Sequence, residues 1–128
     1  MKNNVARYFL DEIEEWRRDI ETINDEIVTI EKKLEAIVRQ NSITGIAAAT
    51  EAHQSLLDAQ MRQFDVLHDE FNRQEVILSP GQEPVDNDAL LQSLRERQNE
   101  LREKMKTAEK EYLDIKFSCH DFVSQMLK

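Results

Sequence analysis

Apolar side chains recur along residues 9–37 at spacings that alternate between four and three. This spacing defines an a/d heptad seam, an apolar edge of a long helix that partner helices must cover along its whole length. Isoleucine fills both columns of the seam, and in parallel coiled coils this composition favours three or four helices over two. The seam residues are Phe9, Ile13, Trp16, Ile20, Ile23, Ile27, Ile30, Leu34 and Ile37.

The seam predicts a first helix over residues 4–40, which contains neither Gly nor Pro. Asn3 or Asn4 is expected to cap its start, because Asn side chains accept hydrogen bonds from the free amides of a first turn. Residues 41–45 then supply polar side chains and Gly45 within one turn's length. So short a joint predicts an antiparallel helical hairpin.

A second helix is predicted over residues 45–78. Its seam contains Leu57, Phe64, Leu67 and Phe71, and polar residues interrupt it at Thr50, His53, Gln60 and Gln74. Further small or apolar residues widen this face, and so broad a face is typical of a helix that touches two neighbours. We therefore expect this helix to lie in the middle of a bundle. The widening residues are Ala49, Ala52, Leu56, Ala59 and Val66.

Pro80, Gly81 and Pro84 predict a loop over residues 79–87, followed by a third helix over residues 88–127. Gln98 occupies a core position of this helix and is expected to set its register. The three helices predict one all-α domain, residues 1–128, folded as an antiparallel three-helix bundle or coiled coil. The same periodicity would serve a multi-chain coiled coil equally well. The third seam includes Leu91, Leu94, Leu101, Met105, Ile115 and Phe122.

The chain has a net charge of −9, and residues 42–87 are its acidic part, with 2 basic and 8 acidic side chains. No stripe of Lys and Arg is present to displace counterions, so we expect no nucleic-acid partner. The longest apolar run, residues 46–49, is too short to cross a membrane, and the polar start lacks the core of a signal peptide. One cysteine, Cys119, makes no internal disulfide, which fits a reducing compartment.

Candidate chemistry is sparse. Asp65 and His68 form half of the paired carboxylate and histidine pattern of di-iron bundles, and the first helix has no core carboxylate to complete it. His53 is expected to form local hydrogen bonds in the core or at an interface. Cys119 and His120 point about 100° apart on a helix, so the thiol is expected to be an inert core group. We expect no catalytic residue, metal ion, cofactor or small-molecule substrate.

The first two helices resemble the coiled-coil region of a channel nucleoporin, the fifty-eight-kilodalton type of the nuclear pore's central transport channel. The resemblance covers about residues 8–78, and Tyr8, Thr44 and His68 carry most of it beyond the heptads. The chain contains no Phe-Gly dipeptide, and residues 88–128 lie outside the resemblance. The shared residues are Tyr8-Phe9, Trp16, Ile27-x-x-Ile30-Glu31-x-x-Leu34, Ile43-Thr44 and Leu67-His68-Asp69.

This resemblance implies a non-enzymatic scaffold of the nuclear pore that assembles with the other channel nucleoporins and a scaffold anchor. Its seam residues would then be the contacts with partner helices. Self-association is a further possibility, and without the pore connection the chain is expected in the cytoplasm. Two alternatives remain open from the sequence. One is a spectrin-like spacer or adaptor, suggested by Trp16 and the helix lengths although Gln98 replaces the usual large aromatic residue. The other is a small metal-binding or enzymatic bundle.

Overall fold

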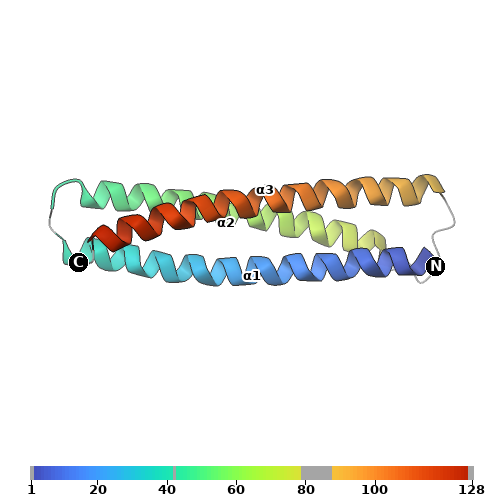
Figure 1. Ribbon diagram of the computed structural model, residues 1–128, viewed down its shortest axis with the longest axis horizontal. Helices are drawn as coiled ribbons and strands as arrows, with labels where there is room; N and C mark the ends of the chain where they lie inside the picture. Colours follow the sequence, from blue (N-terminus) through green and yellow to red (C-terminus); the bar gives the residue numbers. More distant parts are fainter. Residues whose placement is uncertain (1, 42, 79–87, 127–128) are drawn as a thin grey trace.

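Three long helices lie side by side in the computed structural model (Figure 1). They are α1 (Lys2–Gln40), α2 (Ile46–Leu78) and α3 (Asp88–Met126). α1 and α3 run in one direction and α2 runs in the opposite direction. The part of the chain that the structure describes contains no strand, so the predicted all-α three-helix bundle is confirmed. The structure describes residues 2–41, 43–78 and 88–126.

The helix boundaries differ little from the predicted ones. α1 begins at Lys2, two residues before the predicted start. The predicted cap at Asn3 or Asn4 concerns side chains that lie outside the described part of the structure. The described part of α3 reaches Met126, and the predicted end at residue 127 lies outside the described residues. The predicted loop over residues 79–87 lies outside the described residues.

Two features form the joint between α1 and α2, one a side-chain hydrogen bond and the other a backbone conformation. The Asn41 side-chain amide donates to the carbonyl of Ile37 at 2.9 Å, which closes the last turn of α1. Gly45 has a φ of +94°, a backbone conformation that side chains with a Cβ rarely adopt. Its carbonyl accepts the amide of Ala49 at 3.0 Å, so α2 starts directly from this turn.

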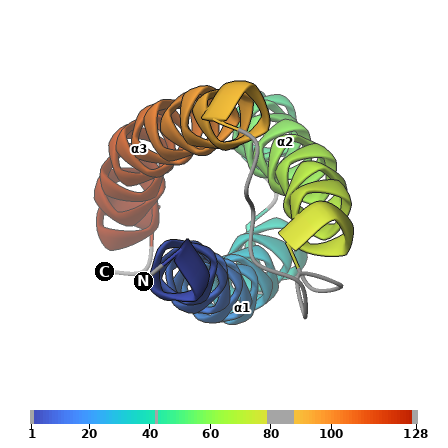
Figure 2. The same cartoon turned by 90° about the vertical axis from the view of Figure 1, so that its right-hand side faces the viewer.

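α2 is the middle helix of the bundle. It contacts α1 and α3 more extensively than those two helices contact each other. The view along the bundle shows all three helices arranged around a common centre (Figure 2). The predicted central position of α2 is therefore confirmed, although not for the predicted reason. Ala52, Leu56, Ala59 and Val66, expected to widen its buried face, are exposed, because α1 and α3 cover only the narrow seam of α2.

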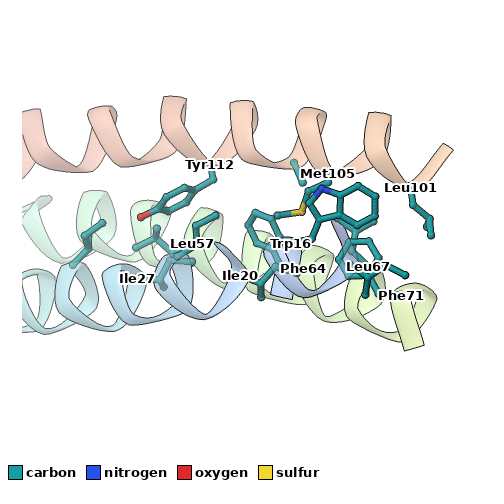
Figure 3. Packing of buried hydrophobic residues seen from close by; sticks show 14 of the residues in the cluster. Trp16, Ile20, Ile27, Leu57, Phe64, Leu67, Phe71, Leu101, Met105 and Tyr112 are labelled. Atoms are coloured by element: carbon teal, nitrogen blue, oxygen red, sulfur yellow. The ribbon is translucent and has the colours of Figure 1, made fainter. Parts of the chain in front are cut away.

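The core extends along the length of the bundle and consists mostly of aliphatic side chains. At one level it becomes aromatic, where Trp16 of α1 packs against Phe71 of α2 with ring centroids 5.0 Å apart. Phe64 and Met105 lie beside this pair (Figure 3). Burying one large apolar side chain contributes about 1.5–3 kcal/mol, so a continuous seam of this kind supplies most of the driving force for folding.

Candidate interaction surface

The residues predicted to face partner helices lie inside the chain's own core. All nine seam residues of α1 are buried, and the helices that cover them are α2 and α3 of the same chain. Leu57, Phe64, Leu67 and Phe71 of α2 are buried as well, together with Leu94, Leu101 and Met105 of α3. Only Leu91, Ile115 and Phe122 are half-buried. In the closed bundle, these side chains are mostly unavailable to another molecule.

A buried glutamine connects all three helices near the α1 N-terminus. The side-chain amide of Gln98 in α3 donates to the backbone carbonyl of Phe9 at 3.2 Å and to Glu12 Oε1 at 2.9 Å, both in α1. Its own Oε1 accepts from Gln74 Nε2 of α2 at 3.3 Å. Because these partners sit at fixed levels on two neighbouring helices, sliding α3 by one turn would break the bonds. This geometry supports the register role expected for Gln98.

Two glutamines of α2 also bond to α3, which the sequence pattern did not indicate. Gln60 Nε2 donates to the carbonyl of Ala108 at 2.9 Å, and Gln74 Nε2 donates to the carbonyl of Leu94 at 3.2 Å. Both side chains are almost fully buried. The Oε1 atom of Gln74 has no hydrogen-bond partner. These polar interruptions of the α2 seam are therefore specific contacts with the α3 backbone.

The border between α1 and α3 is closed by ion pairs. Arg102 holds both carboxylate oxygens of Glu12, through Nε and Nη2, at 2.7 Å each. Burial raises the pKa of Glu12, but hydrogen bonds from Arg102 and Gln98 outweigh it and leave the pKa below its ordinary value. Further along, Glu26 Oε1 accepts from Tyr112 at 2.7 Å and from Lys116 at 2.9 Å, and these bonds lower its pKa.

The border between α1 and α2 combines an ion pair with a contact between like charges. Arg17 holds Glu75 through two hydrogen bonds of 2.8 and 2.9 Å and also reaches Asn72 at 2.6 Å. In the last third of α1, Glu31 faces Asp58 of α2. Burial and this neighbouring carboxyl group raise the pKa of Glu31 to about 7. Sequence reasoning missed these borders, although Glu12, Arg17 and Glu26 each flank a seam residue, where interhelical pairs of coiled coils form.

The border between α2 and α3 has an apolar side chain and a pocket on its surface. Leu56 and Val66 of α2 are 48 % and 57 % exposed, and Val66 lies at this border. A pocket of about 430 Å³ opens next to Val66, lined also by Leu67, Glu103 and Thr107. At its edge, Lys104 of α3 pairs with Glu70 of α2 at 3.1 Å, and half of the Lys104 side chain remains exposed. This border therefore combines an exposed apolar side chain with a pocket between two helices.

The candidate chemical groups have other partners or are buried. His53 Nδ1 lies 2.9 Å from the carbonyl of Ala49, and its ring stacks on Phe122 with centroids 4.6 Å apart, which confirms the expected local bonding. His68 Nδ1 lies 3.4 Å from the side-chain amide of Asn72. Cys119 is buried, and burial raises the pKa of its thiol to about 11, whereas His120 beside it is exposed. The thiol is therefore protonated at neutral pH.

Among the described residues, no three or more His, Cys, Asp or Glu side chains lie together in a way that could hold a metal ion. Asp65 and His68 therefore have no further ligands beside them in this described part of the chain. None of the described helices is long and apolar enough to cross a membrane. The fold and surface together define an all-α antiparallel three-helix bundle whose heptad seams close on one another. Comparisons with protein-family models, curated proteins and solved structures found no significant match to this chain.

Proposed function

We propose that this chain is a non-enzymatic coiled-coil scaffold, a helical rod that assembles with partner helices. One observation carries the proposal: the chain covers its own seams, yet leaves large apolar side chains of α2 exposed, among them Val66 at the border with α3. Exposed apolar side chains that line up along helices are typical of surfaces that bind other proteins. Partner binding would use this outer surface and leave the closed core intact.

The state of the reactive side chains supports the non-enzymatic part of the proposal. Nucleophilic catalysis requires an activated nucleophile beside a base. Cys119 is a buried thiol with a raised pKa, and His53 stacks on an aromatic ring with its Nδ1 beside a backbone carbonyl. Neither group is arranged to act on a substrate.

The resemblance of residues 8–78 to channel nucleoporins supplies a more specific form of the proposal, a structural component of the nuclear pore's central channel. Three of the shared residues, Tyr8, Thr44 and His68, lie outside the buried core, and Tyr8 is 64 % exposed. Core packing therefore does not dictate them, and their presence supports a likeness beyond the heptad pattern. In this form of the proposal the partners are the other channel nucleoporins and the location is the nuclear pore.

Affinity purification of the tagged chain from its native source tests both forms. The general proposal expects other coiled-coil proteins to co-elute at fixed stoichiometry, and the specific form expects channel nucleoporins and fluorescence at the nuclear rim. A chain that elutes alone would contradict the general proposal. Recovery of coiled-coil partners without any nucleoporin would be consistent with the general scaffold proposal and would contradict its nuclear-pore form. Stoichiometric iron or zinc in elemental analysis would instead favour a metal-binding bundle.

A further inference from the structure

α2 carries a second line of residues with heptad spacing, on its outer side. Ala52, Leu56, Ala59, Gln63 and Val66 follow one another at alternating spacings of four and three. Of these, Ala52, Leu56, Ala59 and Val66 are exposed, and Gln63 is half-buried. We call these five residues the outer seam. Two helices pack along each other when each presents residues at alternating spacings of four and three. The outer seam has this spacing, so a further helix could pack along it.

The outer seam lies beside α3. Gln63 and Val66 line the pocket of about 430 Å³ together with Glu103, Lys104 and Thr107 of α3. A groove between two helices gives a third helix contacts on both sides, and a pocket of this size has room for a large apolar side chain. Ala52 and Ala59, at other levels of the outer seam, have small side chains, so the axis of a further helix could approach α2 closely there.

Charge indicates the chemistry of the helix that would fit. On α2 the exposed acidic side chains outnumber the exposed basic ones, with Glu51, Asp58, Asp65 and Asp69 against Arg62 and Arg73, whereas residues 103–114 of α3 carry exposed charges of both signs. The basic residue at the pocket, Lys104, already pairs with Glu70. A second copy of a chain with net charge −9 would be repelled from this surface. A helix with Lys or Arg beside its apolar edge would be attracted to it.

We propose that the α2 outer seam and the adjoining flank of α3 bind a basic amphipathic helix of another protein. Apolar side chains of that helix pack on Leu56 and Val66, one of them enters the pocket, and its basic flank faces the exposed acidic residues of α2. The inference rests on the proposed scaffold function and assigns one surface to it. The bundle core stays closed, because Leu56 and Val66, on which the helix would pack, are exposed side chains of α2.

The test uses the full chain and three synthetic peptides of three heptads each. The first places Leu at a/d positions with Lys on both flanks, the second has Glu in place of Lys, and the third is a scramble of the first without heptad spacing. Calorimetric titration should show 1:1 binding of the first peptide, at least tenfold tighter than either other peptide. Equal binding of the scramble would mean attraction by net charge alone and would overturn the proposal, as would no binding of the first.

Two double variants locate the surface. Leu56→Gln with Val66→Gln removes apolar contact without changing charge and should weaken binding of the Lys peptide at least tenfold. Val28→Gln with Val38→Gln makes a matched change on exposed positions of α1 and should leave binding within twofold. Equal weakening by both variants would overturn the proposal. If native partners still co-purify with the Leu56→Gln, Val66→Gln variant, the scaffold function stands and the outer seam is excluded as its surface.

Discussion

α1 and α2 are both amphipathic helices of one bundle, but they divide their residues differently. α1 has one uninterrupted apolar seam, and on both sides of it ion pairs tie the helix to its neighbours through Glu12, Arg17 and Glu26. α2 has an inner seam interrupted by buried glutamines, and on its outer side it exposes further apolar residues, among them Leu56 and Val66. The two helices therefore have different roles. The regular seam of α1 supplies a large share of the buried core, whereas α2 sets the register through its buried glutamines and leaves apolar side chains exposed to other molecules.

The largest predicted effect breaks the α1 seam. Ile27 is fully buried, and its neighbour Val28 is 42 % exposed. Ile27→Asp places a carboxylate without a partner in the core and should cost several kcal/mol, about 4 or more, enough to unfold a marginally stable bundle. Val28→Asp makes the same change on the adjacent exposed position and should cost less than about 1 kcal/mol. Thermal melts followed by circular dichroism compare the two, and equal losses would show that the seam does not hold the rod together.

The next effect distinguishes the two buried glutamines that meet between α2 and α3. Gln98→Leu removes bonds to Phe9 and Glu12 and leaves buried groups without their partner, at a cost of about 1–3 kcal/mol. Gln74→Leu removes the bonds that Gln74 donates to α3, but it also removes the buried Oε1 atom that has no partner. The second change offsets the first, so the cost should stay below about 1 kcal/mol. Urea unfolding followed by Trp16 fluorescence measures both. A larger cost for Gln74→Leu would contradict the assigned roles.

A smaller effect concerns the ion pairs that close the sides of α1. Arg102→Met removes the two-point contact with Glu12 and should destabilise the bundle by about 1 kcal/mol, and by less at high salt. The control is Lys106→Met, which removes an exposed pair within one helix and should change stability by less than about 0.5 kcal/mol. If the two variants behave alike at low salt, the interhelical pair adds nothing to the closure of α1.

The sequence was sufficient to predict the fold because its strongest signals are local. Heptad spacing on three segments and breakers confined to two joints fixed the number, type and order of the helices. The burial of residues such as Ile27 and Leu101 follows from that spacing alone. Helix ends were harder, since a short polar joint such as residues 41–45 predicts a turn but not the residue at which the next helix begins, which here is Ile46.

The outer surface could not be predicted in the same way. Leu56 and Val66 looked like extra core residues of α2, because a broad apolar face has the same pattern whether or not a neighbour covers all of it. Their exposure depends on where α1 and α3 come to lie, which is a property of three helices together. The interhelical partners of Gln60 and Gln74 likewise depend on the relative register of α2 and α3, which neither helix specifies alone.

The smallest predicted effect concerns the border between α1 and α2 where like charges meet. Burial, Asp58 of α2 and Glu35 of α1 raise the pKa of Glu31 from 4.5 to about 7. The folded state therefore favours the protonated carboxyl, so the stability it contributes is full below pH 4.5 and is lost as the pH rises to about 7. Solvent screening at this half-exposed site limits the change to about 1 kcal/mol or less.

Glu31→Gln mimics the protonated form and should flatten the dependence of unfolding free energy on pH between 4.5 and 7, with a gain in stability at pH 8. Glu12, Glu26 and Glu75 have lowered pKa values, so their titration destabilises the bundle only below about 4.5 and lies outside this window. Urea titrations of the wild type and the variant at pH 5, 6, 7 and 8 measure the slope. An unchanged slope in the variant would show that Glu31 does not experience Asp58, and that another carboxyl group with a raised pKa, such as Glu109 of α3 beside Asp19 of α1, accounts for the pH dependence.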